Sequence, residues 1–420
     1  MRSGVGLLLL CFLTLVFSLP FGAVSAPQKV VLEYYTWGSD IKTIENEQYL
    51  FSYFTNRYPH IEIEVSATGS IASHNEKITV QHAAGIAPDL YTISGSASHT
   101  SLFFDTDMVL DLTEWARRDR IDFNRFIPGA WAYTWRDGKL RAFPRSTKGT
   151  AYATGVLVYN RKLFDEGGLR YPWQGWTFDD LIGTAKKLTR SVSGGPEPDV
   201  WGAVFEAAGW YRHVWSNGGE MLDESETDIS LNTPEAMEAL EWYAKWPNEF
   251  GITGGSFERE TAGMAYKSTG GFLRVAPAGL DWAFAETPRG PRSEQSYTVG
   301  GCNVVAISSQ TKHPEEAWEV LKFLVSEENQ QREVFELGAG TALLRSVAFD
   351  RRHVYREGPP YDLTPILLQA TKPEPQAPGW AEAKAAINAA LTPVWNGQKS
   401  VRVAIDEVLP IAKAMLRQSK

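Results

Sequence analysis

The chain has 420 residues, with 41 Lys and Arg against 50 Asp and Glu, and only 2 cysteines. This length exceeds one ordinary hydrophobic core, so two domains are expected. The acidic balance argues against nucleic acid as a partner, because phosphate backbones need a clustered basic surface. It also argues, less strongly, against binding to an anionic membrane surface.

The first residues predict a secretory signal peptide covering 1–25. Arg2 precedes an apolar run from Val5 to Leu19, and Pro20 and small residues follow. The alternative is a membrane anchor, but the run is shorter than the ~20 residues that a spanning helix needs. No second apolar segment of that length follows. We therefore expect an exported protein that is soluble after cleavage, in the periplasm or outside the cell.

Cys302 is the one cysteine left after the signal, because Cys11 lies inside it. It cannot form a disulfide within the chain. Its neighbours, in GGCNVVAI, are those of an apolar strand. We expect a buried structural cysteine rather than a nucleophile.

Short strands alternate with helices after the signal. Strands are expected at 29–37, 61–65 and 90–93, and helices at 41–58 and 73–84. The second helix starts at the capping box Ser73-His-Asn-Glu76. This order of elements is typical of a sheet with helices on its faces.

A hinge is expected in the segment that follows Asp137-Gly138, which is a two-residue hairpin signal. The next strand stops at Pro144, which cannot donate a ladder hydrogen bond. A polar stretch, 145–150, then leads to a β-prone run, 154–159. A strand that breaks, crosses a polar linker and resumes indicates passage from one lobe to another, with the functional cleft beside it.

The same rhythm resumes beyond the hinge. Helices are expected after the caps at Thr177 and Thr233, after His313-Pro, and over 380–391 and 401–417. Strands are expected at 201–206, 264–266 and 299–308. Two further crossings between lobes are placed at the Pro-rich run 287–292 and near 343–349.

Familiar catalytic and metal-binding motifs are absent from the sequence: there is no nucleophile elbow, Walker A loop, H-E-x-x-H or paired C-x-x-C. The seven histidines show no metal-ligand spacing on one helix. A carboxylate pair of a glycosidase could be dispersed among the acidic residues, but nothing singles one out. We expect no enzyme activity, no cofactor and no required metal.

Tryptophan is abundant, with 15 residues, many beside glycine or small polar residues. Aromatic faces pack against the C–H surfaces of sugar rings, while hydroxyls, amides and carboxylates meet polar groups. Core packing is the alternative for each tryptophan, and we apply it to Trp115, Trp131, Trp135, Trp242, Trp246 and Trp318. Ligand contact is favoured for Trp210 and Trp380, is as plausible as packing for Trp37, and is slightly disfavoured for Trp215.

The order of these pieces resembles family 1 of the bacterial extracellular solute-binding proteins, the receptors of ATP-driven sugar importers. The matching segments span nearly the whole chain after the signal: GIAPDLYTIS (85–94), VLDLTEW (109–115), DGKLRAFP (137–144), VLVYNRKLFDEGGL (156–169), WTFDDLIGTAKKLT (176–189), SNGGEML (216–222), NTPEAMEALEWY (232–243) and GGCNVVAISSQTKHPEEAWEVLKFL (300–324).

This resemblance implies a two-lobed periplasmic-binding-protein-like fold of type II, with two α/β domains joined by hinge strands. One lobe would comprise 27–144 plus 289–345, and the other 145–288 plus 346–420. Transferred position by position, it implies ligand contacts at Trp37, Ser39, Asp40, Ser94, Ser96, Tyr152, Thr154, Trp210, Tyr211, Gly270, Gly271, Phe272 and Trp380.

The function implied is binding of a neutral mono- or oligosaccharide between the lobes and its delivery to the membrane subunits of an ABC permease. We expect a monomer. Two alternatives stay open: a binding protein for a phosphorylated polyol or a peptide, and a secreted glycosidase. A phosphate ligand would need basic residues at the cleft, and those near enough in the sequence are Arg145, Lys148, Arg212 and Lys267.

Overall fold

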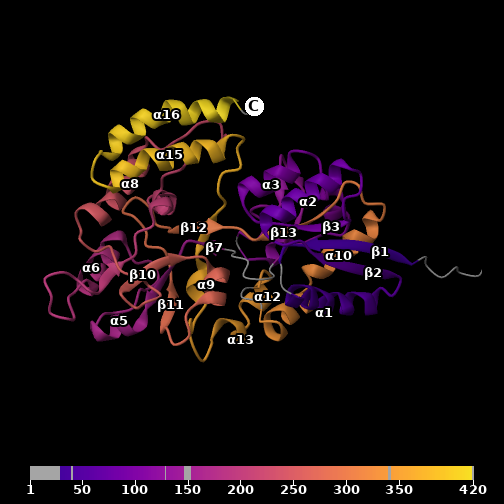
Figure 1. Cartoon of the computed structure of the whole chain (residues 1–420), viewed down its shortest axis with the longest axis horizontal. Coiled ribbons are helices and arrows are strands. Elements are labelled where there is room, and N and C mark those ends of the chain that lie inside the picture. Colours follow the sequence, from indigo (N-terminus) through magenta and orange to yellow (C-terminus); the bar gives the residue numbers. More distant parts are fainter. Residues whose placement is uncertain (1–28, 39–40, 128, 146–152, 339–341, 419–420) are drawn as a thin grey trace, which may run out of the picture.

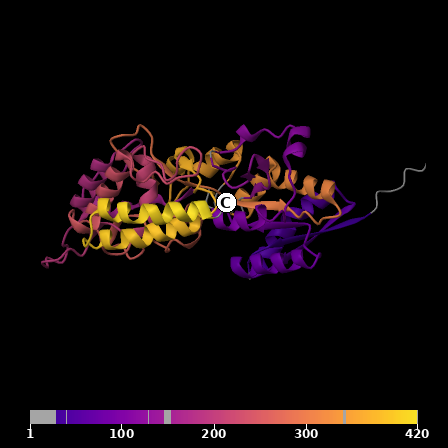
Figure 2. The same ribbon diagram turned by 90° about the horizontal axis from the view of Figure 1, so that it is seen from above.

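Figure 1 shows the computed structural model of the chain, which describes residues 29–38, 41–127, 129–145, 153–338 and 342–418. The expected signal peptide lies outside these residues. Two groups of helices and strands lie side by side, each around its own sheet, with a small third sheet between them (Figures 1 and 2). We refer to the two groups as the first and second lobes.

The first lobe is built on a five-stranded sheet of order β2-β1-β3-β13-β6. β1 runs parallel to β2 and β3, and β13 runs antiparallel to β3 and β6. The strands are β1 (Val30–Thr36), β2 (Ile61–Ala67), β3 (Leu90–Ile93), β6 (Phe143–Arg145) and β13 (Asn303–Ile307). The helices around the sheet are α1 (Ile41–Arg57), α2 (Ile71–Ala83), α3 (Ala97–Phe104), α4 (Thr113–Arg118), α10 (Pro314–Leu324) and α11 (Glu327–Gln331).

The second lobe is built on a four-stranded sheet of order β11-β8-β10-β9. Its strands are β8 (Val156–Asn160), β9 (Trp201–Ala203), β10 (Ala262–Lys267) and β11 (Trp282–Ala285). Its helices are α5 (Arg161–Glu166), α6 (Phe178–Leu188), α7 (Trp210–Ser216), α8 (Pro234–Asn248), α9 (Thr269–Val275), α15 (Trp380–Trp395) and α16 (Val401–Gln418). α15 and α16 pack together and against α8, on the upper left of Figure 1.

The small sheet, of order β14-β12-β7, joins the lobes, and we call it the hinge sheet. It contains β7 (Ala153–Thr154), β12 (Tyr297–Gly300) and β14 (Ala370–Lys372). The chain passes through it three times: from β6 through β7 to β8, from β11 through β12 to β13, and through β14 to α15. Three short helices precede β14: α12 (Arg345–Ala348), α13 (Arg351–Val354) and α14 (Thr364–Leu368).

The second passage lies later in the chain than the sequence predicts. The Pro-rich run 287–292 stays with the second lobe, because the Phe178 amide donates to the Arg289 carbonyl at 3.0 Å and the Gly290 amide to the Ser216 carbonyl at 2.7 Å. The crossing is instead at β12 and the two residues after it. The expected strand 299–308 is consequently two strands, β12 and β13. The assignment of 289–296 to the first lobe was therefore wrong.

The third passage is longer than expected. α12 packs on α11 of the first lobe, whereas α14 packs on β11 of the second. Residues 345–372 therefore run between the lobes, and the lobe boundary expected at 345–346 marks only the beginning of this passage. The remaining lobe limits stay a prediction.

Local signals set several element ends. Thr177 and Asp180 form the capping box of α6, Thr233 caps α8, and Pro234 is the first residue of α8. The hairpin between β4 (Trp135–Arg136) and β5 (Lys139–Leu140) is confirmed, with φ 50° at Asp137 and 71° at Gly138. The other helical segments are short: the 3-10 turns η1 (Phe123–Arg125) and η2 (Ala207–Gly209), and the π-helical turn η3 (Arg332–Glu336).

The cap of α2 was predicted at the wrong residue. The helix begins at Ile71, and Ser70 is its N-cap, accepting a hydrogen bond from the Ser73 amide. The prediction for Cys302 is confirmed: the thiol is free, only 2% of the residue is exposed, and the sulfur donates to the Ala130 carbonyl at 3.0 Å. Burial raises the pKa of this thiol to about 12, which keeps it in the unreactive protonated form.

Candidate functional site

The ends of several strands meet at the hinge sheet. In the first lobe β3 ends at Ile93, which pairs with Val304 near the start of β13. Two residues separate β13 from the hinge strand β12. In the second lobe β10 ends at Lys267, which pairs with Val156 at the start of β8, just after β7. Open α/β sheets present their ligand-binding loops at such strand ends.

The first-lobe wall of this region begins with Trp37, which follows β1 and is partly exposed. Its indole contacts the His74 ring edge to face, with 5.7 Å between centroids. His74 is buried and bonds through Nε2 to the Thr92 carbonyl at 2.8 Å. Burial lowers the pKa of His74 to about 4. The imidazole that packs against the Trp37 indole is therefore neutral.

The loop after β3 is held by its neighbours. The Gly95 amide donates to Asn303 Oδ1 at 3.1 Å, and Ser96 caps α3 by accepting from the His99 amide. A Cβ atom at Gly95 would lie 1.9 Å from the Cys302 carbonyl oxygen. Only glycine allows this approach, and it leaves Ser94 and Ser96 partly exposed on the wall.

The second-lobe wall carries Tyr211, which is partly exposed, with the Lys384 ammonium 4.9 Å from its ring centre. Lys384 forms an ion pair with Glu374. The Trp380 indole nitrogen donates to the same carboxylate at 3.3 Å. An aromatic ring, a cation and a carboxylate are thus fixed together at the start of α15.

A groove of about 510 Å³ lies between α3 of the first lobe and the segment that enters α15. We call it the interlobe groove. On the first-lobe side it is lined by α3 and the residue after it, and on the second-lobe side by the segment entering α15. Its polar lining residues include Ser98, Ser101, Asp105, Glu374, Gln376 and Lys384, and Trp380 lies beside them.

Arg136 joins the two sides at the edge of this groove. Its guanidinium bonds to the Asp105 carboxylate at 2.8 Å and donates to the Gln376 carbonyl. The Gln376 amide in turn donates to the Ala132 carbonyl at 3.0 Å. The start of the α15 segment is therefore anchored to the first lobe.

Glu206 is a further polar group at these strand ends, and sequence reasoning did not identify it. It follows β9 closely, its side chain is 47% exposed, and it forms an ion pair at 2.8 Å with Arg212, whose side chain is 1% exposed. Burial alone would lower the pKa of Arg212, but the nearby carboxylate of Glu206 holds it above its ordinary value. The only sequence signal was the spacing i, i+6 across the start of α7.

Comparison with known proteins identifies the family. The family model for bacterial extracellular solute-binding proteins matches residues 40–331, well over half of the chain. The chain belongs to this family. The resemblance stated from the motifs is confirmed, and so is the expectation of a non-enzymatic protein, because the family binds solutes.

The relatives of this solute-binding protein are distant. A protein of Brucella abortus named as a binding protein is 25% identical over 310 residues, which cover 70% of this chain and 72% of the relative. A Deinococcus radiodurans protein named as a probable ABC transporter-binding protein is 23% identical over 222 residues, or 46% of this chain and 49% of the relative.

Solved structures confirm the fold. The sugar-binding protein MalE of Xanthomonas citri has a TM-score of 0.76 at 18% identity, covering 93% of this chain and 98% of that one. The cyclic α-maltosyl-1,6-maltose binding protein of Arthrobacter globiformis gives 0.75 at 18%, covering 93% and 100%. A substrate-binding protein of Listeria monocytogenes in complex with cycloalternan gives 0.70 at 19%, covering 93% and 99%. The expected two-lobed α/β fold is therefore that of this solute-binding protein.

The predicted contact residues of the binding protein separate into four groups, of which the fourth, Trp210 and the segment after β10, is described below. Trp380 is among the residues that line the interlobe groove, whereas Trp37, Ser94 and Ser96 lie partly exposed on the first-lobe wall and Tyr211 on the second-lobe wall, outside its lining. Thr154 lies in β7 of the hinge sheet, paired with Val299. Ser39, Asp40 and Tyr152 lie outside the described residues. The role of each as a ligand contact stays a prediction.

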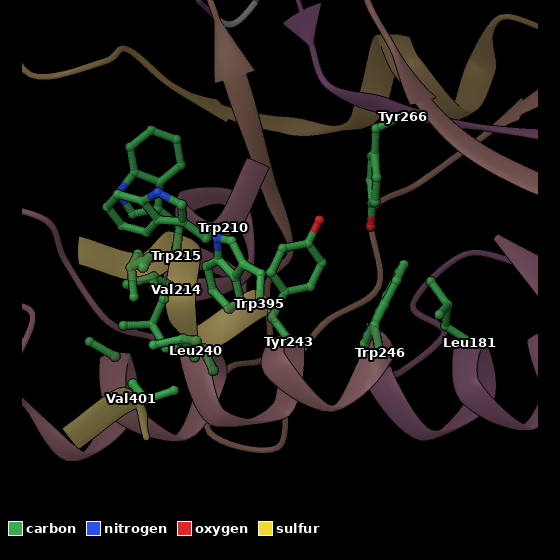
Figure 3. Close-up of a cluster of buried hydrophobic side chains, with 14 of the residues drawn as sticks. Leu181, Trp210, Val214, Trp215, Leu240, Tyr243, Trp246, Tyr266, Trp395 and Val401 are labelled. Atoms are coloured by element: carbon green, nitrogen blue, oxygen red, sulfur yellow. The ribbon is translucent and has the colours of Figure 1, made fainter. Parts of the chain in front are cut away.

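Trp210 does not lie on a wall, which corrects its assignment as a stacking residue. It is 0% exposed, and its indole nitrogen donates to Asn388 Oδ1 at 2.8 Å. Figure 3 shows it among Val214, Trp215 and Trp395 in the core of the second lobe. Trp215 is buried in the same core. The glycine before Trp210 leaves room for the Arg212 guanidinium rather than for a ligand.

Phe272 is also corrected, whereas Gly270 and Gly271 stay a prediction as ligand contacts. The segment expected as a ligand loop is the first turn of α9, which contains Gly270, Gly271 and Phe272. Phe272 is 4% exposed and packs edge to face on Phe257 and Trp282. Its ring therefore fills the core rather than facing the groove.

The basic residues near the hinge are neutralised. Arg145 is buried between Glu47 and Glu333, Arg212 pairs with Glu206, and Lys267 pairs with Glu258. Lys148 lies outside the described residues. Among the described residues, no group of three His, Cys, Asp or Glu side chains is placed to hold a metal. No described helix of the binding protein is both long and apolar enough to cross a bilayer.

Proposed function

We propose that the chain is the substrate-binding component of an ABC transporter and binds a neutral mono- or oligosaccharide in the interlobe groove. The observation that carries the proposal is the interlobe groove itself, in which the hydroxyl and carboxylate groups of Ser98, Ser101, Asp105 and Glu374 lie beside the Trp380 indole. Aromatic faces accept sugar C–H surfaces, and the polar groups match sugar hydroxyls. Closed lobes would deliver the ligand to the permease subunits in the membrane, with the receptor acting as an exported monomer.

The nature of the charges favours a neutral ligand over a phosphorylated polyol. Each described basic residue that the sequence offered for a phosphate has a carboxylate partner. The groove itself contains Asp105, Glu374 and Glu382 with the paired Lys384. A phosphate would meet net negative charge there, whereas hydroxyl groups would find acceptors.

The proposal is tested by thermal-shift screening followed by calorimetric titration. The panel contains maltotriose, maltotetraose, cycloalternan and α-D-tagatose, with a polyol phosphate and an oligopeptide for comparison. A neutral sugar is expected to stabilise the protein, by about 2.7 kcal/mol at a concentration of 100 Kd, and to be recovered unchanged. Stabilisation by the phosphate or the peptide alone, or formation of a cleaved product, would contradict the proposal.

Two tyrosine variants locate the binding site. Tyr211→Ala removes a ring from the second-lobe wall and should weaken binding of the selected sugar about tenfold or more. Tyr171→Ala is the matched control, because Tyr171 is also partly exposed and also has a cation, Arg161, 5.2 Å from its ring centre. It lies beside α5, away from the groove, and should leave the affinity unchanged.

A further inference from the structure

Glu206 is held at the surface by two buried groups beneath it. Arg212 Nη2 donates to Glu206 Oε2 at 2.8 Å, and the Tyr243 hydroxyl donates to the Glu206 carbonyl at 2.8 Å. Arg212 and Tyr243 are 1% and 0% exposed, whereas the Glu206 side chain is 47% exposed. The main chain and the carboxylate of Glu206 are thus both oriented from the core side.

The Arg212 guanidinium occupies a space that two glycines provide. A Cβ at Gly155 would lie 2.4 Å from Nη2, and a Cβ at Gly209 would lie 2.1 Å from Nη1. The Tyr266 ring closes another side, with its centre 4.1 Å from the guanidinium carbon. Gly155 joins the hinge strand β7 to β8, so the arginine also packs against the first passage between the lobes.

This arrangement is costly if it serves stability alone. Nε and Nη1 of Arg212 have no hydrogen-bond partner in the described part of the chain. A buried guanidinium with one carboxylate partner is often matched or exceeded in stability by an apolar side chain of similar volume. A role beyond packing would explain why the second lobe keeps this charge beneath the strand ends.

We propose that Arg212 is a positioning residue of the binding site: it holds the Glu206 carboxylate at the strand ends as an acceptor for ligand hydroxyl groups. The inference rests on the proposed function. A carboxylate accepts hydrogen bonds only, so it selects ligands that present several hydroxyl donors. A charge fixed from beneath also repels phosphate and carboxylate ligands without any clash in shape.

A double-mutant cycle tests whether Arg212 and Glu206 act together in binding. The affinity measured is that for maltotetraose, or for the neutral sugar of the panel that binds most tightly. Arg212→Met keeps the buried length but removes the charge, and it should weaken binding about ten- to hundredfold, as loss of an oriented charged hydrogen bond does. Arg212→Lys should restore most of the affinity. Glu206→Gln should weaken binding by a similar factor, and adding Arg212→Met to it should cause little further loss.

Two controls separate positioning from stability. Leu240→Ala removes a side chain of the same core, 0% exposed, and should lower the melting temperature with unchanged affinity. Gly209→Ala inserts one methyl group against the Arg212 guanidinium and should weaken sugar binding. The loss of affinity that it causes should be smaller in the Arg212→Lys background than in the wild type. If Arg212→Met behaves like Leu240→Ala, or if its effect on Kd multiplies with that of Glu206→Gln, the proposal is overturned.

A ligand-free measurement keeps this inference distinguishable from the proposed function. Glu206→Gln leaves Arg212 buried without its partner. In the wild-type background this substitution should therefore lower the melting temperature by several degrees, whereas in the Arg212→Met background it should hardly change it. If no sugar in the panel binds, the proposed function fails while this coupling still decides whether Arg212 holds Glu206. Equal losses in both backgrounds would overturn the positioning role.

Discussion

His213 is enclosed by aromatic rings in the core of the second lobe. It is 0% exposed, and the Tyr243 ring centre lies 4.5 Å away, with Trp246 and Tyr266 close by. Neither ring nitrogen has a hydrogen-bond partner among the described residues. Burial, and then the charge of the adjacent Arg212, hold its pKa well below the ordinary value. The folded state therefore requires a neutral imidazole.

This enclosure predicts a loss of stability in mild acid. In the unfolded chain His213 binds a proton near pH 6.5, whereas in the folded chain it stays neutral at that pH. The free energy of unfolding is therefore at its full value above pH 6.5 and decreases as the pH is lowered. His74 and His353, with pKa values lowered by burial to about 4, act in the same direction between pH 6.5 and 4. His213→Phe should remove about 1.4 kcal/mol of this loss per pH unit, measured by denaturant titration from pH 7 to 5.

His60→Phe is the control for this prediction, since His60 is partly exposed. It should keep the pH dependence of the wild type. An unchanged slope in His213→Phe would show that another group dominates the acid response.

Trp210 and Trp380, which each follow a glycine at a helix start, differ in their surroundings. Trp210 is packed on all sides, so Trp210→Ala should cost about 3–5 kcal/mol of unfolding free energy, as large core truncations do. The sugar affinity of the folded fraction should be unchanged. Trp380 is also buried, yet it lines the interlobe groove and bonds to Glu374. Trp380→Ala should therefore lower both stability and affinity.

Denaturation and calorimetry on the same samples check the tryptophan prediction. Trp210→Ala with native stability and weakened binding would reverse the assignment made from burial. The sequence did not distinguish the two residues, because both follow glycine at a helix start. Their exposure depends on which distant segment covers them: α15 supplies Asn388 over Trp210.

At the scale of elements, the turn after β3 depends on one glycine. Gly95→Ala would place a methyl group against the Cys302 carbonyl, which is main chain and cannot rotate away. The turn must shift, at a cost of about 1–3 kcal/mol. Since Ser94 and Ser96 flank this position, we also expect weaker sugar binding.

Gly183 provides a control of opposite sign. It lies inside α6, and an added Cβ would meet nothing within 4 Å. Gly183→Ala should stabilise the protein by about 0.5–1 kcal/mol and leave binding unaffected. Chemical denaturation of both variants measures the contrast, and a neutral Gly95→Ala would mean that the turn is free to relax.

Elements with local signals could be predicted from the sequence, and those set by distant contacts could not. Thr177, Thr233 and the Asp137-Gly138 hairpin specify their own geometry through caps and positive φ angles. The Pro-rich run 287–292 shows the opposite case. Proline was consistent with a linker, but main-chain bonds to α6 and to Ser216 keep the run in the second lobe. The exposed Glu206 was missed although its partner, Arg212, is only six residues away, because the burial of Arg212 depends on the distant Gly155 and Tyr266.

At the scale of the whole molecule, the first two passages between the lobes are short and contain glycine. Gly155 follows β7, Gly300 is the last residue of β12, and Gly301 follows it before β13. A Cβ at Gly300 would lie 2.4 Å from Thr371, and one at Gly301 would lie 2.1 Å from the Tyr133 ring. These contacts bring β12 close to β14 and to the first lobe. Rotation of one lobe against the other would then be absorbed at a few residues.

A bound sugar is expected to close the two lobes. Contacts to both walls exist together only when the lobes approach, so a ligand that bridges them favours the closed state by its differential affinity. Small-angle scattering should show a smaller radius of gyration at a saturating concentration of the selected sugar. A panel sugar that does not bind is the control and should leave the scattering unchanged. Identical curves with and without bound sugar would contradict closure, and binding would then be confined to one wall or to a groove already closed.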